Sequence, residues 1–514
     1  MIQIKVLFLA TELYEPAGGL YRYTTNLLNA WRKALEEGRT DLEPLVISVK
    51  NPSQPPEDLK AVERFSDFTE ANKEVEVYEA EREGEKCYFL EGDVPDMERF
   101  HWELWNRYGI DSTKSSHGLE WYNTTLSPFW YWAPRFAEFL RDKKGIGFKA
   151  VDAQDWLAFP GGFLSSERLN LPLVCRIHSG EYGRSLGNPD FSDAPIQIET
   201  ASLAFADYIQ GVSISETVFQ INHLMPLKRE LDEELKKRRS GSWYRYQNYR
   251  NEKIKSFLLY ESESKMTLLK DIIGGMPNGI YLDEWEKVDE RDINEGRERM
   301  EQFLPEKDKF IFFIGRTSYR KGLDFLLQTF SEKKEVYKDV GLLVASSMDK
   351  DTYREYEQRL ESLGISEDVK ILNKWLGNKE KMELMCASDV IALPSVYEPF
   401  GIVALEGLAA DYAAKRNGTT GPVTVVGNTG GMDEIITSGV TGFEVPIHNF
   451  KIETDMLHSA LQKALDEENK EKITKAGAKR VKDKHFRWSY IFNKVLEVYD
   501  LAEENWKERL RYTR

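Results

Sequence analysis

Short apolar runs alternate along this chain with longer stretches in which apolar positions recur at helical spacing. Continuous apolar runs are typical of strands buried on both faces, and spacing by three or four is typical of helices packed on them. The alternation predicts an α/β protein with parallel sheets. The clearest strands are expected at residues 5–10, 174–178, 310–315, 341–345, 369–372, 390–393 and 423–427.

The first expected strand leads through Gly18 and Gly19 into a helix expected at about residues 21–35. A strand, a glycine turn and a helix N-terminus together bring backbone amides to one place, and such amides bind phosphate. Two glycines also make an ordinary tight turn. The pattern alone leaves both interpretations open.

Arg316 and Lys321 follow directly after the expected strand 310–315. Ligands of open α/β sheets bind at the carboxyl ends of the strands. Two cations placed there would stabilise the negative charge that develops on a departing diphosphate. The alternative is a basic loop that only covers the end of the sheet.

Two carboxylates flank a Pro-Phe-Gly turn in residues 398–406, directly after the expected strand 390–393. Phe400 and Gly401 would form the turn, Glu398 would stand at the N-terminus of the next helix, and Glu406 would lie about two turns further on. Such a pair could hold two polyol parts of one ligand. Two solvated glutamates are the alternative.

Residues 398–406 resemble the E-P-F-G-x-x-x-x-E element of retaining, nucleotide-sugar-dependent glycosyltransferases, and among these of the glycogen and starch synthases. Their fold, called GT-B, has two Rossmann-like domains that face each other across a deep cleft. The resemblance implies that Glu398 lies at the donor sugar and that Glu406 binds the donor ribose. It also implies that Arg316 and Lys321 are the family's phosphate pair.

Other segments resemble further elements of that family. His178, at the end of the expected strand 174–178, corresponds to the histidine of T-I-H-N, which reaches the donor glucose. Asp155 corresponds to the acid of H-D-W-H and is expected to contact the sugar or the acceptor. Asn278 begins an element like the family's N-G-I/V-D-x-x-x-W hinge. The donor-phosphate loop T-G-G-x-x-D/E corresponds to Thr429, Gly430 and Gly431.

The chain departs from glycogen synthases at several of these positions. Pro16 stands where they have the lysine of K-x-G-G-L, and Tyr281 replaces the hinge aspartate. Gln154 and Leu157 replace both histidines of H-D-W-H. These departures keep open a different acceptor, such as a sugar, a sugar phosphate or glycerate.

The patterns predict an acceptor-side domain at 1–275, a nucleotide-sugar domain at 276–487 and a C-terminal helix at 488–514 that, by resemblance, crosses back to the first domain. Two segments exceed such a scaffold. The aromatic segment at about 95–135 is expected to be core, with a platform for glucan as the alternative. Basic and aromatic residues at about 227–266 could bind RNA or single-stranded DNA, but the acidic neighbours favour a solvated helical arm or an oligomer contact.

Composition narrows the function classes. The 514 residues, 41% of them hydrophobic, are enough for two or more domains with their own cores. A net charge of −16 argues against a general affinity for nucleic acid or an anionic membrane. No apolar run approaches the ~20 residues of a membrane span. Cys87, Cys175 and Cys386 lie far apart without metal-ligand spacing, which favours a reducing, cytoplasmic setting.

The resemblance implies transfer of glucose from a nucleotide diphosphate glucose, such as ADP-glucose or UDP-glucose, with retention, to the non-reducing end of an α-1,4-glucan. The residues do not decide the donor nucleotide, and a homo-oligomer is compatible with them. Neither a metal nor another cofactor is expected, and the D-x-D triplet at 349–351 is interpreted as a solvated loop. A transferase to a small acceptor and a catalytically silent glucan-binding protein are the alternatives.

Overall fold

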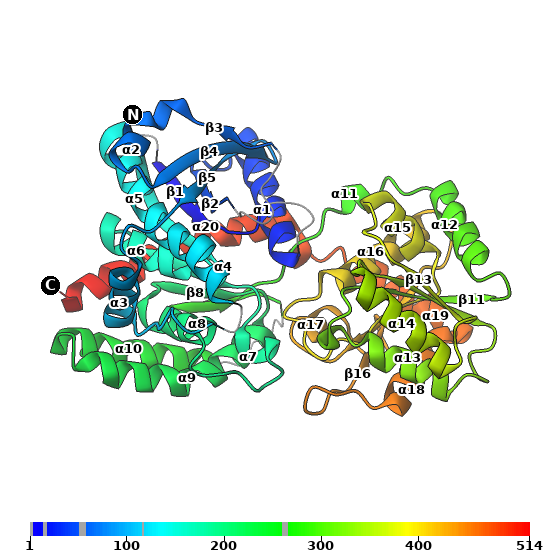
Figure 1. The fold of residues 1–514 in the computed structure, drawn as a ribbon. Coiled ribbons are helices and arrows are strands. Elements are labelled where there is room, and N and C mark those ends of the chain that lie inside the picture. The colour runs from blue at the N-terminus through cyan, green and yellow to red at the C-terminus, as the bar shows by residue number, and fades with distance from the viewer. Residues whose placement is uncertain (1–3, 14–17, 51–57, 116–117, 260–265, 514) are drawn as a thin grey trace. The chain divides into compact units, whose positions relative to one another are not determined.

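The computed structural model describes residues 4–13, 18–50, 58–115, 118–259 and 266–513. It divides into two compact units, each built on its own sheet (Figure 1). The first unit combines Met1–Asn278 with Trp488–Arg514, and the second is Gly279–Arg487. The mixed α/β class expected from the sequence is confirmed.

The sheet of the first unit runs in the order β3-β4-β5-β2-β1-β6-β7-β8-β10-β9. The strands from β5 through β10 pair in parallel, whereas β3, β4 and β9 pair antiparallel at the two edges. The strands are β1 Ile4–Leu9, β2 Glu43–Val49, β3 Lys60–Ala61, β4 Val75–Arg82, β5 Glu85–Gly92, β6 Gly147–Gln154, β7 Leu173–Ile177, β8 Tyr208–Gly211, β9 Leu268–Lys270 and β10 Ile273–Gly275.

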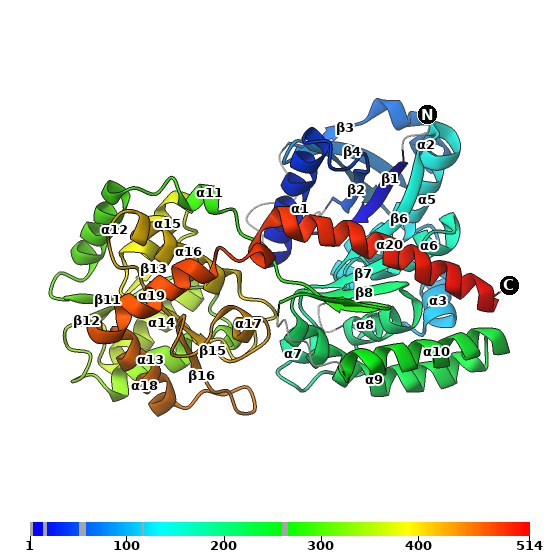
Figure 2. The same ribbon diagram turned by 180° about the vertical axis from the view of Figure 1, so that it is seen from behind.

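Helices cover both faces of this sheet. The C-terminal helix α20 packs on β6, β7 and β8 and contacts α1 and α10 (Figure 2). The helical elements are α1 Gly19–Glu36, η1 Glu63–Phe65, α2 Ser66–Ala71, α3 Met97–Tyr108, α4 Leu119–Trp121, η2 Tyr122–Leu126, α5 Ser127–Lys144, α6 Phe159–Leu169, α7 Glu181–Arg184, α8 Ala194–Phe205, α9 Ile214–Lys236, α10 Gly241–Leu258 and α20 Trp488–Thr513. In the described parts of the chain, no helix is long and apolar enough to cross a membrane.

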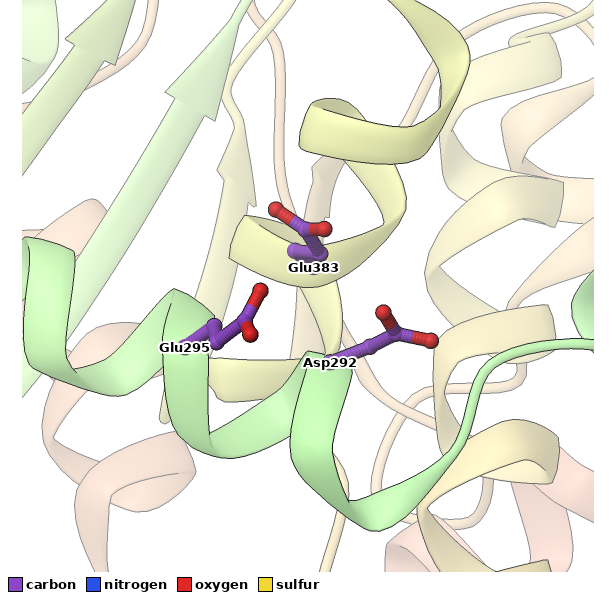
Figure 3. Close-up of side chains that lie close together, drawn as sticks. All are labelled: Asp292, Glu295 and Glu383. Carbon is purple, nitrogen blue, oxygen red and sulfur yellow. The ribbon is translucent and has the colours of Figure 1, made fainter.

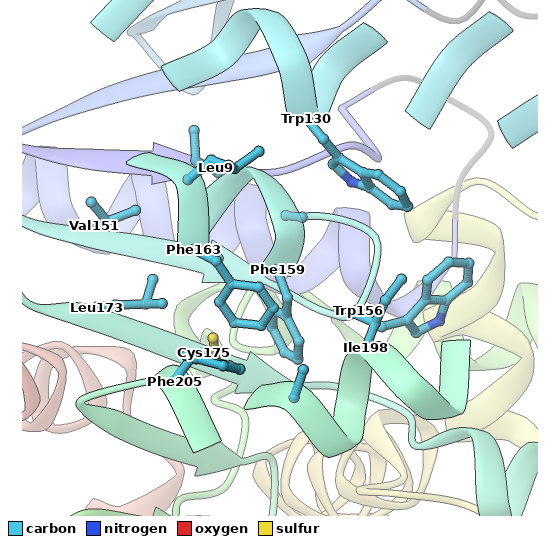
Figure 4. Close-up of a cluster of buried hydrophobic side chains, with 14 of the residues drawn as sticks. Leu9, Trp130, Val151, Trp156, Phe159, Phe163, Leu173, Cys175, Ile198 and Phe205 are labelled. Carbon is cyan, nitrogen blue, oxygen red and sulfur yellow. The ribbon is translucent and has the colours of Figure 1, made fainter. Parts of the chain in front are cut away.

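Neighbouring residues of β1 pack on opposite faces of the sheet. The ring of Phe8 meets that of Trp31 on α1, with centroids 6.5 Å apart, whereas Leu9 belongs to the apolar cluster that includes Phe163 of α6 (Figure 4). Both faces are buried, which is why this strand is a continuous apolar run rather than an alternating one.

The aromatic segment is mostly core, as expected. Trp130 is fully buried, and Trp132 is 2% exposed. The indole Nε1–H of Trp130 donates to the Leu157 carbonyl at 2.7 Å. Only Trp102 and Trp105 of α3 remain open among the described tryptophans of this segment, at 63% and 38% exposure. These two are the most exposed candidates for a glucan platform among the described tryptophans of the segment, and the Arg238 guanidinium lies over the Trp105 ring at 5.2 Å.

The expected solvated arm at 227–266 is instead packed against the first unit, as far as the described residues 227–259 and 266 show. Helices α9 and α10 pack on each other, and α10 packs on α20. Lys228 and Gln247 are buried and hydrogen-bonded at 3.0 Å. The basic run has a structural use, because Arg239 donates to the Arg107 carbonyl at the end of α3. The sequence did not show this packing because Lys228 and Gln247 share the buried sides of these helices with apolar residues such as Leu235 and Phe257.

The sheet of the second unit is parallel throughout, in the order β13-β12-β11-β14-β15-β16. The chain starts in the middle at β11, winds outward on one side and returns to β14 on the other. This is the doubly wound order, with its switch point between β11 and β14. The strands are β11 Lys309–Ile314, β12 Val340–Ala345, β13 Val369–Leu372, β14 Val390–Leu393, β15 Val423–Gly427 and β16 Phe443–Val445.

The helices of the second unit connect these strands, and α13, α14, α15 and α16 each lie between two of them in the chain. The helical elements are α11 Leu282–Trp285, α12 Glu290–Phe303, η3 Tyr319–Lys321, α13 Leu323–Glu332, α14 Lys350–Leu363, α15 Asn378–Ala387, α16 Ile402–Arg416, α17 Met432–Ile435, α18 Thr454–Leu465, α19 Glu467–Arg480 and η4 Lys484–Phe486. The D-x-D triplet is not a loop: Asp349 caps α14 by accepting from the Thr352 amide at 2.9 Å.

Candidate functional site

The loops that follow β11 and β14 touch each other at the switch point of the second unit. The Val396 amide donates to the Arg320 carbonyl at 2.8 Å. A Cβ built on Gly322 would lie 1.8 Å from the Pro394 carbonyl oxygen, and the φ of Gly322 is +74°. Only glycine allows both this approach and this backbone conformation. The two motifs therefore meet where doubly wound sheets bind their ligands.

The charged groups of these two loops face each other. Lys321 forms an ion pair with Glu398, and their side chains are 31% and 16% exposed. Arg316 is exposed, and no described residue forms an ion pair with it. One cation is thus held beside a carboxylate, while the other is open to an anion from solution. A contact of both cations with a diphosphate stays a prediction.

The glycine loop after β15 rests on the turn that carries Glu398. A Cβ on Gly430 would lie 2.0 Å from the Glu398 carbonyl oxygen, and the φ of Gly430 is +51°. The Gly431 amide donates to the Pro399 carbonyl at 2.9 Å. The close approach explains why both positions are glycine. It also occupies the Gly431 amide, which we had expected to face phosphate.

The turn itself packs into the unit. Phe400 is 2% exposed, and Gly401 is the N-cap of α16 with a φ of +93°. Since α16 begins at Ile402, Glu398 precedes the helix instead of starting it. Glu406 accordingly lies little more than one turn into the helix, not about two turns. Thr429 precedes the glycine pair, and its carbonyl accepts from the Met432 amide at 3.1 Å.

Glu406 has a buried partner that the sequence did not suggest. Lys381 of α15 donates to Oε1 of Glu406 at 2.5 Å, and the two side chains are 5% and 9% exposed. A signal was present: Lys381 stands three and four positions before Leu384 and Met385, on the buried side of the helix. A lysine at such a position needs an anionic partner.

His178 lies just beyond β7 in the first unit and is half-buried. Its Nε2 lies 3.0 Å from Oε1 of Gln154, and its ring packs at 4.5 Å on the ring of Tyr23. Burial, together with the nearby Arg176 guanidinium, lowers the pKa of His178 to about 3. The imidazole is therefore neutral at physiological pH.

Asp155 is buried at the end of β6, and its φ of +63° is unusual for a residue with a side chain. Its Oδ1 accepts from the Trp156 amide at 3.2 Å, and its amide donates to the Arg176 carbonyl at 2.8 Å. Burial raises the pKa of Asp155 to about 7. These hydrogen bonds hold the main chain of Trp156 and Arg176 near His178, and a contact of Asp155 with sugar or acceptor stays a prediction.

The remaining expected residues of the first unit are less constrained. Gly18 is the N-cap of α1, and a Cβ on Gly19 would meet no described atom within 4 Å. Pro16 lies outside the described residues. Asn278 is 5% exposed, and its Oδ1 is buried without a hydrogen-bond partner in the described structure. A role of these residues in substrate binding stays a prediction.

Three carboxylates gather between α12 and α15: Asp292, Glu295 and Glu383 (Figure 3). Lys379 lies 3.0 Å from Asp292, and Arg299 lies 2.9 Å from Glu383. Arg291 lies 2.8 Å from Glu295, so each of the three acids has a cationic partner, and we interpret the cluster as an ion-paired contact between the helices.

A family model described as "Glycosyl transferases group 1" matches residues 294–481, which hold the Lys321–Glu398 pair and the glycine loop. These residues form a group 1 glycosyltransferase domain. The match covers most of the second unit and does not reach into the first.

Some relatives of this chain match more of it than the second unit contains. An uncharacterized glycosyltransferase of Methanocaldococcus jannaschii is 26% identical over 73% of this chain and 82% of its own. A D-inositol 3-phosphate glycosyltransferase of Xylanimonas cellulosilytica is 25% identical over 69% and 72%. A glycogen synthase of Chlamydia muridarum is 27% identical over 38% of each chain. The protein is a glycosyltransferase.

The fold agrees with that of solved glycosyltransferases. The catalytic domain of starch synthase IV from Arabidopsis thaliana, bound to ADP and acarbose, matches 98% of this chain and 100% of its own with a TM-score of 0.61. At 16% identity this likeness concerns the fold alone. The expected GT-B fold is confirmed.

Proposed function

We propose that this glycosyltransferase moves glucose from a nucleotide diphosphate glucose with retention of anomeric configuration. The observation that carries the proposal is the ion pair between Lys321 and Glu398 at the switch point of the second unit, with the exposed Arg316 in the same loop as Lys321. When the bond between C1 and the diphosphate oxygen breaks, negative charge develops on the diphosphate. Preorganised cations stabilise that charge more in the transition state than before it.

The buried carboxylate supports a donor of this kind. Glu406 is held by Lys381 in the helix that follows the Glu398 turn, and a carboxylate is suited to accept from the two hydroxyls of a ribose. Glu398 would accept from hydroxyls of the sugar once Lys321 binds phosphate. No side chain of the described site is assigned as a nucleophile, and retention would then follow from attack on the face that the diphosphate leaves.

For the acceptor we propose the non-reducing end of an α-1,4-glucan. The resemblance of residues 398–406 to glycogen and starch synthases supports this choice, as does the similarity to a glycogen synthase. The exposed Trp102 and Trp105 on α3 offer flat apolar faces of the kind on which glucose units stack.

A small acceptor such as a sugar phosphate is the second candidate. The similarity to a D-inositol 3-phosphate glycosyltransferase extends over 69% of the chain, whereas that to a glycogen synthase extends over 38%. Gln154 and Leu157, which replace both histidines of the glucan-synthase element, also favour it.

A released-nucleotide assay tests the proposal. ADP-glucose, UDP-glucose and GDP-mannose are each supplied with glycogen, with a panel of sugar phosphates and glycerate, and without acceptor. Glycogen-dependent release from one glucose donor is the expected result. Release only with a small acceptor would transfer the proposal to the second candidate, and silence with every pair would favour a glucan-binding protein without activity. Arg316→Ala serves as the matched inactive control.

A further inference from the structure

A buried chain of polar side chains leads to His178 in the first unit. Asp152 and Gln154 stand on the same face of β6, and Arg176 of β7 is the register partner of Gln154. Nε2 of Gln154 donates to Oδ1 of Asp152 at 2.6 Å, and Nε of Arg176 donates to Oδ2 of Asp152 at 2.9 Å. All three side chains are at most 1% exposed. Gln154 meets His178 at the end of this chain.

The C-terminal helix completes the network. The hydroxyl of Tyr499 on α20 donates to Oδ2 of Asp152 at 2.7 Å, and Tyr499 is fully buried. Asp152 therefore accepts from three donors, which are Arg176, Tyr499 and Gln154. A carboxylate so surrounded is an acceptor only. It fixes which end of the Gln154 amide points toward it.

The orientation of this amide determines the proton of His178. Because the NH₂ group of Gln154 donates to Asp152, its carbonyl oxygen faces His178. A carbonyl oxygen cannot donate, so the proton must lie on Nε2 of the imidazole. In a neutral ring Nδ1 is then an acceptor. No described residue forms a hydrogen bond with Nδ1.

We propose that Gln154 is a positioning residue that holds His178 in the neutral tautomer protonated on Nε2, so that Nδ1 accepts a hydrogen bond from a hydroxyl of the transferred sugar. The role of the sugar rests on the proposed function. The assignment of the tautomer rests on the network alone. Asp152, Arg176 and Tyr499 act one step further away, by fixing the Gln154 amide.

The groups around the ring agree with a neutral histidine. Tyr23 of α1 packs on it, Arg176 lies beneath it on β7, and the Asp155 carboxyl accepts from the His178 amide instead of from the ring. The positive charge of Arg176 disfavours a second positive charge on the ring. The Asp155 carboxylate bonds to the main chain and therefore does not stabilise an imidazolium.

The test uses the full chain labelled with ¹⁵N-histidine, in which the His178 signals are assigned by their loss in His178→Ala. We expect the wild-type ring to be protonated on Nε2 and to stay neutral through mildly acidic pH. Gln154→Met should shift the ring toward the other tautomer. Gln247→Met is the matched control, because this glutamine is equally buried and bonds to Lys228 and the Ala204 carbonyl, away from His178.

Kinetics separate positioning from a general loss of structure. Gln154→Met should lower kcat/KM for the sugar donor roughly tenfold, the value of one neutral hydrogen bond. In a His178→Ala background it should cause no further loss, whereas Gln247→Met should leave kcat/KM unchanged. A wild-type ring protonated on Nδ1, or a tautomer that Gln154→Met does not change, would overturn the proposal. The expected tautomers without transfer from any donor would instead overturn the proposed function.

Discussion

The buried pair of Lys381 and Glu406 gives a prediction whose size follows from the structure. In Lys381→Met the Glu406 carboxylate, 9% exposed, would lose the cation 2.5 Å away. Removing one partner of a buried pair costs about 3–5 kcal/mol, because the remaining charge stays out of water. For a unit of this size such a loss lowers the Tm by roughly 6–20 °C.

Differential scanning calorimetry of the full chain measures this change in the transition of the second unit. Lys374→Met is the matched control: Lys374 pairs with Glu380 at 2.8 Å, but its side chain is 52% exposed. An exposed pair contributes about 0–1 kcal/mol, so this control should hardly shift the transition. Adding Glu406→Gln to the Lys381→Met protein removes the unpaired charge and should recover part of the lost Tm. If both lysine variants destabilise equally, the pair is not a buried charge pair and the reasoning fails.

Three further predictions concern the donor site and the core. Arg316→Ala or Lys321→Ala should each lower kcat by about 10²–10³, which corresponds to about 2.7–4 kcal/mol. Steady-state kinetics measure the loss, and calorimetry should show an unchanged Tm. Full turnover in both variants would contradict the phosphate role. Gly430→Ala should unfold the donor loop, because the φ of Gly430 is +51° and a Cβ would lie 2.0 Å from a carbonyl oxygen. Gly439 has a φ of +73° but open space around it, so Gly439→Ala should lower the free energy of unfolding in urea by only about 1 kcal/mol. Burial raises the pKa of Asp411 well above its usual value, so the charged form is penalised in the folded state and stability falls as the pH rises toward that folded pKa. Asp411→Asn should therefore raise the Tm more at mildly alkaline than at acidic pH, and a difference independent of pH would refute this.

The elements that could be predicted are those built from local apolar runs. Strands β13, β14 and β15 begin and end at the expected residues, because each is a short, mainly hydrophobic run bounded by polar, proline or glycine positions. The antiparallel strands β4 and β5 were not expected. They are rich in charged residues, and only three of the eight residues in each are buried, so their apolar positions are too few to stand out.

Only the parts of the site that lie in recognisable motifs could be predicted from the sequence. Arg316, Lys321 and Glu398 were singled out by their place after two strands and by the family resemblance, and the doubly wound order explains why the two loops meet. The partner of Glu406 and the support of His178 were not found. Lys381, Gln154 and Tyr499 act through contacts between distant elements, and a single polar residue in an apolar strand or helix does not reveal which neighbour it will meet.

The most direct test of the central claim is the fate of the sugar itself. The donor carries glucose labelled with ¹³C at C1 and is mixed with the acceptor that supports nucleotide release. NMR then follows the labelled carbon. We expect one equivalent of nucleoside diphosphate for each new α-linked glucosyl unit, and neither product with the Arg316→Ala variant. A β-linked product would contradict retention, and a donor left intact with every acceptor would contradict the assignment of the Arg316, Lys321 and Glu398 site to sugar transfer.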